Sequence, residues 1–511
     1  MSNVLVIDVG TQSMRGIVFD EKGNLLIKEQ VSYKPYLSKE NGYMEQSADM
    51  YWSVLCGITK AINDKRPDLM SSVMAISVST FRDTAVLLDK ERKVVRNCIL
   101  WSDMRTADTS KKLPFKQRFL FNLVGMSRTL KAIRGRVLTN WIQDNEPEVW
   151  KKVDKVALIS GYLNFKLSGK LVESYASVIA HLPFSSKKKT WLKKNDLLFP
   201  VFNLPLDMMV PLCNPGDLLG EVTAEVAQLT GLPIGLKIFA SGSDKSCETL
   251  GSGCLASNVA SISFGTTSTV QFSSKKYFEP EPFMPSYPSV VKGYYNPEVE
   301  IFRGYWMISW FKKNFAQHLE KRSEETGKSI EALMNEEMSA IPAGSDGLIL
   351  QPFWQAGLTN PEAKGAIIGF NDCHTRAHVY RAIIEGIDYA LREGLERMER
   401  RGHQPIDFVT VSGGGAQSDI ICQIAADIFN RPVKRVQTHE TCALGAAIIT
   451  FMACGVYKTV DDAVKNMVRF VDVFKPDPET AKIYNEIYHN VYMKLYKKLQ
   501  PFYLYMDKQK G

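Results

Sequence analysis

A strand, a Gly-Thr turn and a second strand occur in this order twice, about half the chain apart, and this repeat constrains the fold more than any other feature. The first copy reads VLVIDVGTQSMRGIVFD (residues 4–20), and the second reads ASISFGTTSTVQF (residues 260–272). A duplicated unit at the head of each half predicts two related domains. The alternative is that two unrelated hairpins share a Gly-Thr-x-Ser turn.

The two turns, Gly10-Thr11-Gln12-Ser13 and Gly265-Thr266-Thr267-Ser268, allow two interpretations. Each could simply join two buried strands, as in an ordinary hairpin. Glycine also lets the backbone approach phosphate oxygens closely, and Thr and Ser hydroxyls add hydrogen bonds without bulk. Two such turns that face each other would hold the β- and γ-phosphates of ATP.

Length and composition limit the class of protein. At 511 residues the chain is too long for one hydrophobic core and should form two or more domains. Its 45% apolar and 23% charged residues are typical of a folded, soluble protein. The net charge of +8 is small for this length and the basic residues are scattered. We therefore expect an acidic small molecule such as a nucleotide as partner, and no nucleic acid.

Cysteine use and hydropathy predict a cytoplasmic protein without a membrane partner. The nine cysteines are dispersed and form no C-x-x-C pair, which favours reduced thiols over disulfides or zinc ligands. The N-terminus starts with a strand-like run, so we expect no signal peptide. The apolar stretch 442–457 is shorter than the roughly 20 residues that span a bilayer, and it is expected to be a buried helix.

The remaining periodicity predicts further strands and helices. Strands are expected at 73–80 and 84–89, and helices at 48–63, 146–167, 223–229, 305–315 and 378–401. The tail from Asp477 is expected to be helical. Its Tyr and Lys side chains favour a packing or oligomer surface, and a homodimer is one expected state.

A third glycine-rich segment, SGGGAQS at residues 412–418, lies between an expected strand and an expected helix. A helix N-terminus favours anions, and the glycines would let a nucleoside lie flat against the turn. Neither the G-x-G-x-x-G fingerprint nor a G-x-x-x-x-G-K-[ST] loop is present. The alternative is a purely structural turn.

Two aspartates are candidates for phosphoryl-transfer chemistry, which needs a cation near the phosphates and a base on the acceptor hydroxyl. Asp8 ends the first strand beside Gly10 and is the candidate metal-side carboxylate, acting on Mg²⁺ through water. Asp244 follows a buried strand and is the candidate base. Each could instead be a helix-cap or turn aspartate.

These segments together resemble the FGGY family of carbohydrate kinases, in the actin-like ATPase superfamily, over essentially the whole chain. The matching motifs are D-x-G-T-x-S-x-R (8–15), W-S-D-M-R (101–105), G-S-D-K-x-x-x-x-L-G-x-G (242–253), F-G-T-T-S (264–268), G-A-I-I-G-F with H-V-Y-R-A-I-I-E (365–385), and S-G-G-G-A-x-S with Q-x-x-A-D and E-x-x-A-L-G-A-A (412–447). The resemblance implies an α/β fold of two ribonuclease-H-like (actin-like ATPase) domains around a central cleft. Residues 1–246 would bind sugar and carry the base, and residues 247–511 would bind ATP.

The resemblance also implies roles for individual residues. Asp244 takes the position of the catalytic base, while Glu440 and Gly445 would shape the adenosine pocket. The ATP-binding candidates are Gly10, Thr11, Gln12, Ser13, Arg15, Gly265, Thr266, Thr267, Gly413, Gly414, Gly415, Ala416 and Ser418. ATP and Mg²⁺ are the expected cofactors.

The substrate loop reads Phe81-Arg82-Asp83-Thr84. It is more similar to the Gln-Arg-Glu-Thr of glycerol kinases and the Met-Arg-Glu of autoinducer-2 kinases than to the Gln-Met-His of xylulokinases. An Arg-carboxylate pair suits a polyol or open-chain sugar. The predicted substrate-binding residues are Arg82, Asp83, Asp244 and Lys245. Lys245 could favour an acidic acceptor or pair with Glu248, and Gly161 stands where many relatives have Asp.

The sequence thus predicts an ATP-dependent carbohydrate kinase, a phosphotransferase with an alcohol group as acceptor. The substrate would be an open-chain sugar, ketose or polyol, with glycerol-kinase-like and xylulokinase- or gluconokinase-like activities as specific alternatives. Alternatives from other classes are a catalytically weak sugar-sensing protein and a filament-type ATPase. Four aromatic residues could stack on a sugar ring or belong to the core: Tyr305, Trp306, Trp310 and Trp354.

Overall fold

The computed structural model of the chain describes residues 2–33, 42–110, 113–123, 125, 127–179, 181–282, 284–357 and 360–508. It contains two compact units, which are described separately. The first unit comprises Met1–Gly251, Ser286–Asn296 and Glu440–Val468, and the second comprises Ser252–Pro285, Pro297–His439 and Arg469–Gly511. The first unit thus includes two segments, 286–296 and 440–468, that come later in the chain. The domain boundary between residues 246 and 247 that the sequence suggests stays a prediction.

The first unit is built on a six-stranded mixed sheet in the order β13-β14-β5-β1-β2-β3. Strands β1, β2 and β3 form an antiparallel meander, and β1 pairs with β5, and β5 with β14, in parallel. Every residue of β1 is buried, as its apolar run predicts. The strand bounds are β1 Asn3–Val9, β2 Ser13–Asp20, β3 Leu25–Ser32, β5 Val73–Thr80, β13 Leu218–Glu221 and β14 Lys237–Phe239.

The second unit repeats this sheet in the order β19-β16-β15-β22-β23-β24. Its first three strands form an antiparallel meander, β15 and β22 pair in parallel, and so do β22 and β23. The bounds are β15 Val259–Phe264, β16 Ser268–Phe272, β19 Glu298–Ile301, β22 Phe408–Ser412, β23 Val433–Val436 and β24 Phe470–Phe474. The sheets match strand for strand, so the duplication predicted from the two Gly-Thr turns is confirmed.

Long helices cover these sheets. In the first unit α1 (Ala48–Lys65) packs on β2 and β3, and in the second unit α14 (Arg376–Gly402) packs on β16 and β19. Both match helices expected from periodicity. The other helices of the second unit are α11 Trp306–Phe315, α12 Glu320–Thr326, α13 Ile330–Ser339, α15 Asp419–Phe429, α18 Pro478–Ile487 and α19 Met493–Lys508.

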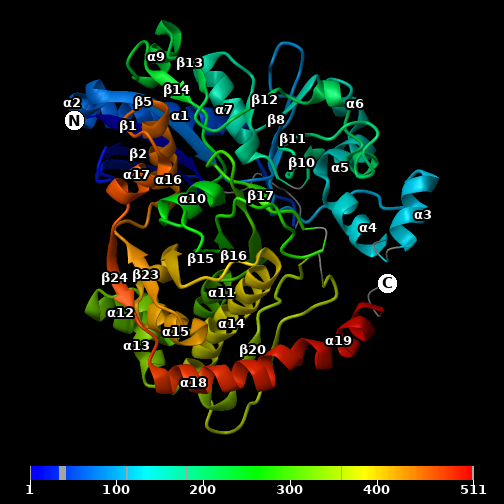
Figure 1. The fold of residues 1–511 in the computed structure, drawn as a ribbon, viewed down its shortest axis with the longest axis vertical. Helices are drawn as coiled ribbons and strands as arrows, with labels where there is room; N and C mark the ends of the chain where they lie inside the picture. Colours follow the sequence, from blue (N-terminus) through cyan, green and yellow to red (C-terminus); the bar gives the residue numbers. More distant parts are fainter. Residues whose placement is uncertain are drawn as a thin grey trace. The chain divides into compact units, whose positions relative to one another are not determined.

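Two helices of the first unit, α10 (Asp244–Gly251) and α16 (Thr441–Ala453), lie against each other and carry several predicted site residues (Figure 1). Their backbones approach so closely that a Cβ on Gly251 would stand 1.9 Å from the Thr441 carbonyl oxygen. A Cβ on Gly445 would stand 1.9 Å from the Cys247 carbonyl oxygen. Glycine at both positions therefore permits the crossing.

An inserted region between β5 and β14 has its own core. Here the predicted helix over 146–167 is wrong: a strand interrupts it. The apolar run at β8 pairs with β6 in an antiparallel ladder, and this tertiary pairing overrides helical periodicity. The bounds are β6 Ala85–Leu88, α3 Phe115–Leu123, α4 Ser127–Arg136, α5 Leu138–Asn145, α6 Pro147–Trp150, β8 Lys155–Leu158, α7 Ile159–Ser168 and α9 Ala224–Thr230.

Two predictions concern features that the described ranges lack. All nine cysteines lie in these ranges, and none forms a disulfide there. Across the same ranges, no helix combines the length and the apolar character needed to cross a bilayer. The stretch expected as a buried helix from residue 442 is α16, whose side chains are almost all buried.

Candidate functional site

The first Gly-Thr turn is closed by its own backbone and held by side chains from two other segments of the first unit. The amide of Gly10 donates to the Ser13 carbonyl over 2.9 Å, which closes the turn. Gln46 Nε2 donates to the Thr11 carbonyl over 2.9 Å, and Trp101 Nε1 donates to the Thr11 hydroxyl over 3.1 Å. Trp101 begins the W-S-D-M-R motif. The motif therefore supports the turn, although Trp101 and Thr11 lie 90 residues apart in the chain.

Asp8 is buried at the end of β1, where its carboxylate has one donor on each oxygen. Arg15 Nη1 donates to Oδ2 over 3.1 Å, and the Cys442 thiol donates to Oδ1 over 3.1 Å. Burial raises the pKa of Asp8 above its ordinary value, although the positive charge of Arg15 acts in the opposite direction. Cys442 also contacts the Ser79 hydroxyl at 3.3 Å, which links the group to β5.

Arg15 continues this charged network on its other side. Its Nε lies 3.6 Å from Oε2 of Glu440, whose Oε1 accepts a hydrogen bond from Lys28 Nζ over 2.9 Å. Glu440 therefore has cationic partners within the first unit. Gly445 contacts the Cys247 backbone there as well. The adenosine-pocket role that the family resemblance implies for Glu440 and Gly445 stays a prediction.

Asp244 is the first residue of α10 and is half-buried beside a cation. Arg82 Nε lies 4.0 Å from Asp244 Oδ1, and the Arg82 guanidinium stacks over the Tyr287 ring at 5.2 Å from the centroid. Burial raises the pKa of Asp244 to about 6, and the charges of Arg82 and Lys245 limit that rise. Such a carboxylate is ionised at neutral pH yet basic enough to accept a proton.

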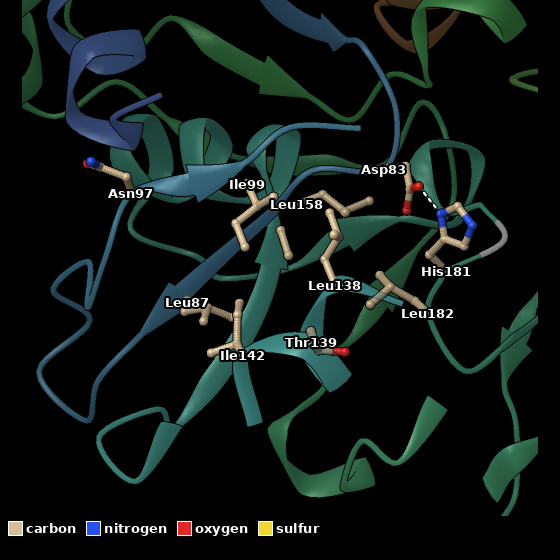
Figure 2. Close-up of a pocket in the computed structure, with 11 residues that line it drawn as sticks. Asp83, Leu87, Asn97, Ile99, Leu138, Thr139, Ile142, Leu158, His181 and Leu182 are labelled. Carbon is tan, nitrogen blue, oxygen red and sulfur yellow. Dashed lines mark hydrogen bonds and ion pairs between the residues drawn. The ribbon is translucent and has the colours of Figure 1, made fainter. Parts of the chain in front are cut away.

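Lys245 has its charge offset within α10. Its Nζ donates to Glu248 Oε2 over 2.7 Å. This pairing is one of the two roles that the sequence allowed for Lys245, the other being contact with an acidic acceptor. The neighbouring predicted substrate residue, Asp83, is also engaged. Its carboxylate pairs with His181 Nδ1, as Figure 2 shows. The Asp83–His181 contact could not be predicted from the sequence, because the directions of the two side chains depend on the fold.

The pocket beneath the Asp83–His181 pair lies in the inserted region (Figure 2). Aliphatic side chains such as Leu87, Ile99 and Leu158 line it. Its cavity volume of about 30 Å³ is sufficient for a single water and far too small for a sugar. Asp83, which belongs to the loop that the sequence assigned to the substrate, therefore also borders a small apolar cavity.

The second unit contains a much larger pocket, with a cavity volume of about 800 Å³. This volume falls within the range of small-molecule sites. Five of the predicted ATP-binding residues line it: Gly265, Thr266, Gly414, Gly415 and Ser418. The structure thus brings together two glycine-rich turns that are far apart in the chain. Thr267, Gly413 and Ala416 belong to the same turns but are not among the lining residues described.

Backbone contacts fix the mouth of this pocket. The amide of Tyr305 donates to the Gly265 carbonyl over 3.1 Å, and the amide of Trp306 donates to the Thr266 carbonyl over 3.3 Å. The Tyr305 ring packs on Phe264, with ring centroids 4.9 Å apart. Tyr305 is thus a pocket wall in the second unit.

The other aromatic candidates for sugar stacking behave differently. Trp310 and Trp354 pack edge to face, with centroids 5.6 Å apart, and both lie against the core of the second unit. Trp306 also packs against this core. These contacts match the core interpretation that the sequence left open.

Sequence reasoning missed the helical wall of this pocket. Asn335 of α13 donates to the Ser418 hydroxyl over 3.1 Å and accepts from the Tyr380 hydroxyl over 2.9 Å. Ser329 and Glu331, at the start of α13, also line the pocket. No motif marks these residues, since they lie on an ordinary amphipathic helix. Only the polar Asn335 on its inner side could have been a signal.

A magnesium ion can be tested against these residues. Within the described ranges, no cluster of three or more His, Cys, Asp or Glu side chains could hold a metal by itself. Mg²⁺ commonly uses only one or two protein carboxylates and keeps several waters. Asp8 offers one carboxylate, and each of its oxygens retains a lone pair beyond its present hydrogen bond. The donor set therefore fits a water-mediated Mg²⁺ that a nucleotide brings with it.

The two units have sheets of one topology; the second unit has a glycine-lined pocket, and the first has a buried carboxylate network. Together these features define the class of sugar kinases with an actin-like ATPase fold. Comparison with known proteins gives the family. Residues 3–251 match the N-terminal domain and residues 260–454 the C-terminal domain of the FGGY family of carbohydrate kinases. The chain belongs to this family and is a carbohydrate kinase, a phosphotransferase that acts on an alcohol group.

Individual relatives resemble the chain along nearly its full length. Xylulose kinase of Lactococcus lactis subsp. lactis is 30% identical, over 95% of each chain. Xylulose kinase of Bacillus subtilis is 28% identical, also over 95% of each chain. The crystal structure of ligand-bound xylulose kinase from Lactobacillus acidophilus superposes with a TM-score of 0.82 at 19% identity, covering 99% of this chain and 100% of the other. This likeness confirms the predicted fold of two ribonuclease-H-like domains, and ATP is the phosphate donor of the family.

Proposed function

We propose that Asp244 is the general base that activates the acceptor hydroxyl of a small open-chain sugar. The observation that carries this proposal is its place at the start of α10, half-buried, with a pKa of about 6 and Arg82 at 4.0 Å. One carboxylate oxygen of Asp244 accepts the hydroxyl proton as the sugar oxygen attacks the γ-phosphorus. The bond to the leaving ADP breaks in the same displacement, and the proton stays on Asp244.

We further propose that ATP binds in the pocket of the second unit. Gly414 and Gly415 would lie against the nucleoside, and Gly265 and Thr266 would contact phosphate through backbone amides and a hydroxyl. Gly10, Thr11, Gln12, Ser13 and Arg15 remain predicted phosphate contacts of the first unit. Asp8 would hold a water of Mg²⁺, whose charge offsets that of the phosphates.

For the acceptor we propose a ketose, with pentuloses as the first candidates. The relatives at 28–30% identity are xylulose kinases, which supports this choice over a polyol. The engagement of Asp83 by His181 supports it as well, because the carboxylate of the glycerol-kinase-like Arg-Asp pair already has a partner. We expect Arg82, which lies 4.0 Å from Asp244 and over the Tyr287 ring, to orient a hydroxyl of the sugar.

The test combines a substrate panel with one variant. ADP release is measured by a coupled assay over pentuloses, hexuloses, aldonates, glycerol and erythritol, and then for Asp244→Asn on the best acceptor. We expect turnover to fall by about 10²–10⁴-fold with ATP binding unchanged. Asp461→Asn, an exposed position on helix α17 (Val460–Met467), is the matched control and should keep wild-type turnover. Near-wild-type turnover by Asp244→Asn would exclude Asp244 as the base.

A further inference from the structure

The inserted region of the first unit presents an apolar ridge to solvent. Phe115, Phe119 and Leu123 lie on α3 at a spacing of four residues, with 73%, 58% and 73% of their surface exposed. Residues spaced by four lie on the same face of a helix, one turn above the other. The opposite side of α3 is already accounted for, because Phe121 is buried in the local core. The ridge therefore does not serve the packing of the helix.

The same region has a strong positive charge. Between Asp108 and Asp144 the chain has no acidic residue and eight basic ones: Lys111, Lys112, Lys116, Arg118, Arg128, Lys131, Arg134 and Arg136. This run departs from the scattered distribution of basic residues in the rest of the chain. On α3 the helical repeat puts Lys116 on one side of the ridge and Arg118 on the other, and both are exposed. Lys131 is exposed on α4, which packs beside α3 (Figure 1).

We propose that α3 and α4 form a peripheral binding surface for an anionic lipid bilayer. An exposed apolar ridge between cationic side chains is the pattern of helices that lie in the plane of a membrane interface. The apolar side chains enter the boundary of the acyl chains, and the basic residues contact the acidic headgroups. The sequence suggested no membrane partner because its apolar stretch 442–457 is too short to span a bilayer, but this mode of binding needs no spanning helix.

The ring geometry favours lipid over nucleic acid as the occupant. A nucleobase needs a free aromatic face on which to stack. Here Phe115 and Phe119 stack on each other at an interplanar angle of 19°, and the Arg118 guanidinium lies over the Phe115 ring at 5.8 Å from its centroid. Phe119 and Arg118 thus both cover the Phe115 ring, and the exposed ring edges and Leu123 methyl groups suit an acyl phase.

Co-sedimentation with lipid vesicles tests the proposal with the full-length enzyme. The wild type should bind vesicles that contain phosphatidylglycerol, bind less as salt increases, and fail to bind pure phosphatidylcholine. The triple variant Phe115→Ser, Phe119→Ser, Leu123→Ser should bind at least about tenfold more weakly. Charge reversal by Lys116→Glu, Arg118→Glu and Lys131→Glu should abolish the preference for anionic lipid.

Controls separate this surface from general stickiness and from misfolding. Phe502→Ser removes an equally exposed phenylalanine from α19 and should leave vesicle binding unchanged. Kinase activity without vesicles should be the same in all variants, because these residues lie outside the proposed catalytic set. The proposal is overturned if the wild type ignores anionic vesicles or if the triple variant binds them equally well. It is also overturned if the same variants instead lose affinity for single-stranded nucleic acid.

Discussion

The thiol of Cys442 donates a hydrogen bond to Oδ1 of Asp8 over 3.1 Å, although the two residues lie 434 positions apart in the chain. Cys442 is at the start of α16, which the close crossing with α10 holds against β1. Arg15 occupies the other carboxylate oxygen, also at 3.1 Å. Two donors thus fix the plane of the carboxylate that we propose for the Mg²⁺ side of the site. Cys442 is accordingly a positioning residue.

Replacing Cys442 should weaken the apparent affinity of the enzyme for Mg²⁺. We expect Cys442→Ala to raise the Mg²⁺ concentration for half-maximal activity by about tenfold, because partners that orient a ligand group commonly matter to that extent. Cys442→Ser keeps a donor and should recover most of the loss. Cys454→Ala, at the other end of α16, is the matched control. An unchanged Mg²⁺ titration for Cys442→Ala would remove the positioning role.

The pH profile of kcat/KM should report the titration of Asp244. The base must be ionised to accept a proton, so activity should rise with pH up to about 6 and then level off. Arg82 lowers this pKa by its charge. Arg82→Gln should therefore move the acidic limb to higher pH in addition to any loss of substrate binding. Arg66→Gln, on an exposed pair with Asp68, should leave the limb in place. A limb that does not respond to Arg82→Gln would assign it to another group.

The sequence predicted those parts of the site that depend on local backbone chemistry. The Gly265 and Gly414 turns were found because glycine and small hydroxyl residues after a strand have few structural alternatives. Contacts that depend on tertiary packing were not predictable, such as Asn335 of α13 reaching Ser418. The same holds for the strand that interrupts the expected helix over 146–167, because its partner β6 lies far away in the chain.

Gly161 illustrates a departure from the family pattern that the structure explains. A Cβ at this position would stand 2.6 Å from Oε2 of Glu173, and the Gly161 amide donates to that oxygen over 3.0 Å. The carboxylate of Glu173 thus occupies the space that an Asp side chain at residue 161 would need. The acidic group beside Gly161 is that of Glu173, twelve residues further along the chain, and this contact depends on the fold. Burial raises the pKa of Glu173 to about 7.

Asp388 should make the second unit less stable as pH increases. It is fully buried in α14, and neither carboxylate oxygen has a hydrogen-bond partner among the residues that the structure describes. Burial raises its pKa well above the ordinary 3.8. At a pH above 3.8 the Asp388 carboxyl of the unfolded chain loses its proton, while the same carboxyl in the folded chain retains it. Unfolding is thereby favoured by about 1.4 kcal/mol for each pH unit until the folded carboxyl ionises.

Asp388→Asn removes this proton linkage and should be more stable than the wild type at neutral pH. Urea unfolding at several pH values between about 4.5 and 7.5 measures the difference, which should grow with pH. Other buried acids such as Glu385 titrate in both proteins, so only the difference between them is informative. Asp461→Asn should show no such growth, because its side chain is exposed. A constant difference across the range would contradict the assignment.

Two adjacent glycines allow the effect of a substitution on the packing of the proposed nucleotide pocket to be measured separately from its effect on ATP binding. A Cβ on Gly415 would stand 2.2 Å from Cε1 of Tyr305 and 2.8 Å from Cβ of Phe264. Gly415→Ala should therefore displace a wall of the pocket, lower the free energy of unfolding by about 1–3 kcal/mol and raise the KM for ATP. A Cβ on Gly414 meets no atom within 4 Å, although this residue lines the same pocket.

Gly414→Ala should consequently leave the unfolding free energy within about 0.5 kcal/mol of the wild type. If a nucleoside lies against this turn, the new methyl group enters the space that the ligand occupies, and the KM for ATP rises without a change in stability. Thermal unfolding and ATP titrations of both variants distinguish the two effects. An unaltered KM for ATP in Gly414→Ala would place the nucleoside elsewhere in the pocket, because a methyl group pointing into an occupied site cannot be neutral for binding.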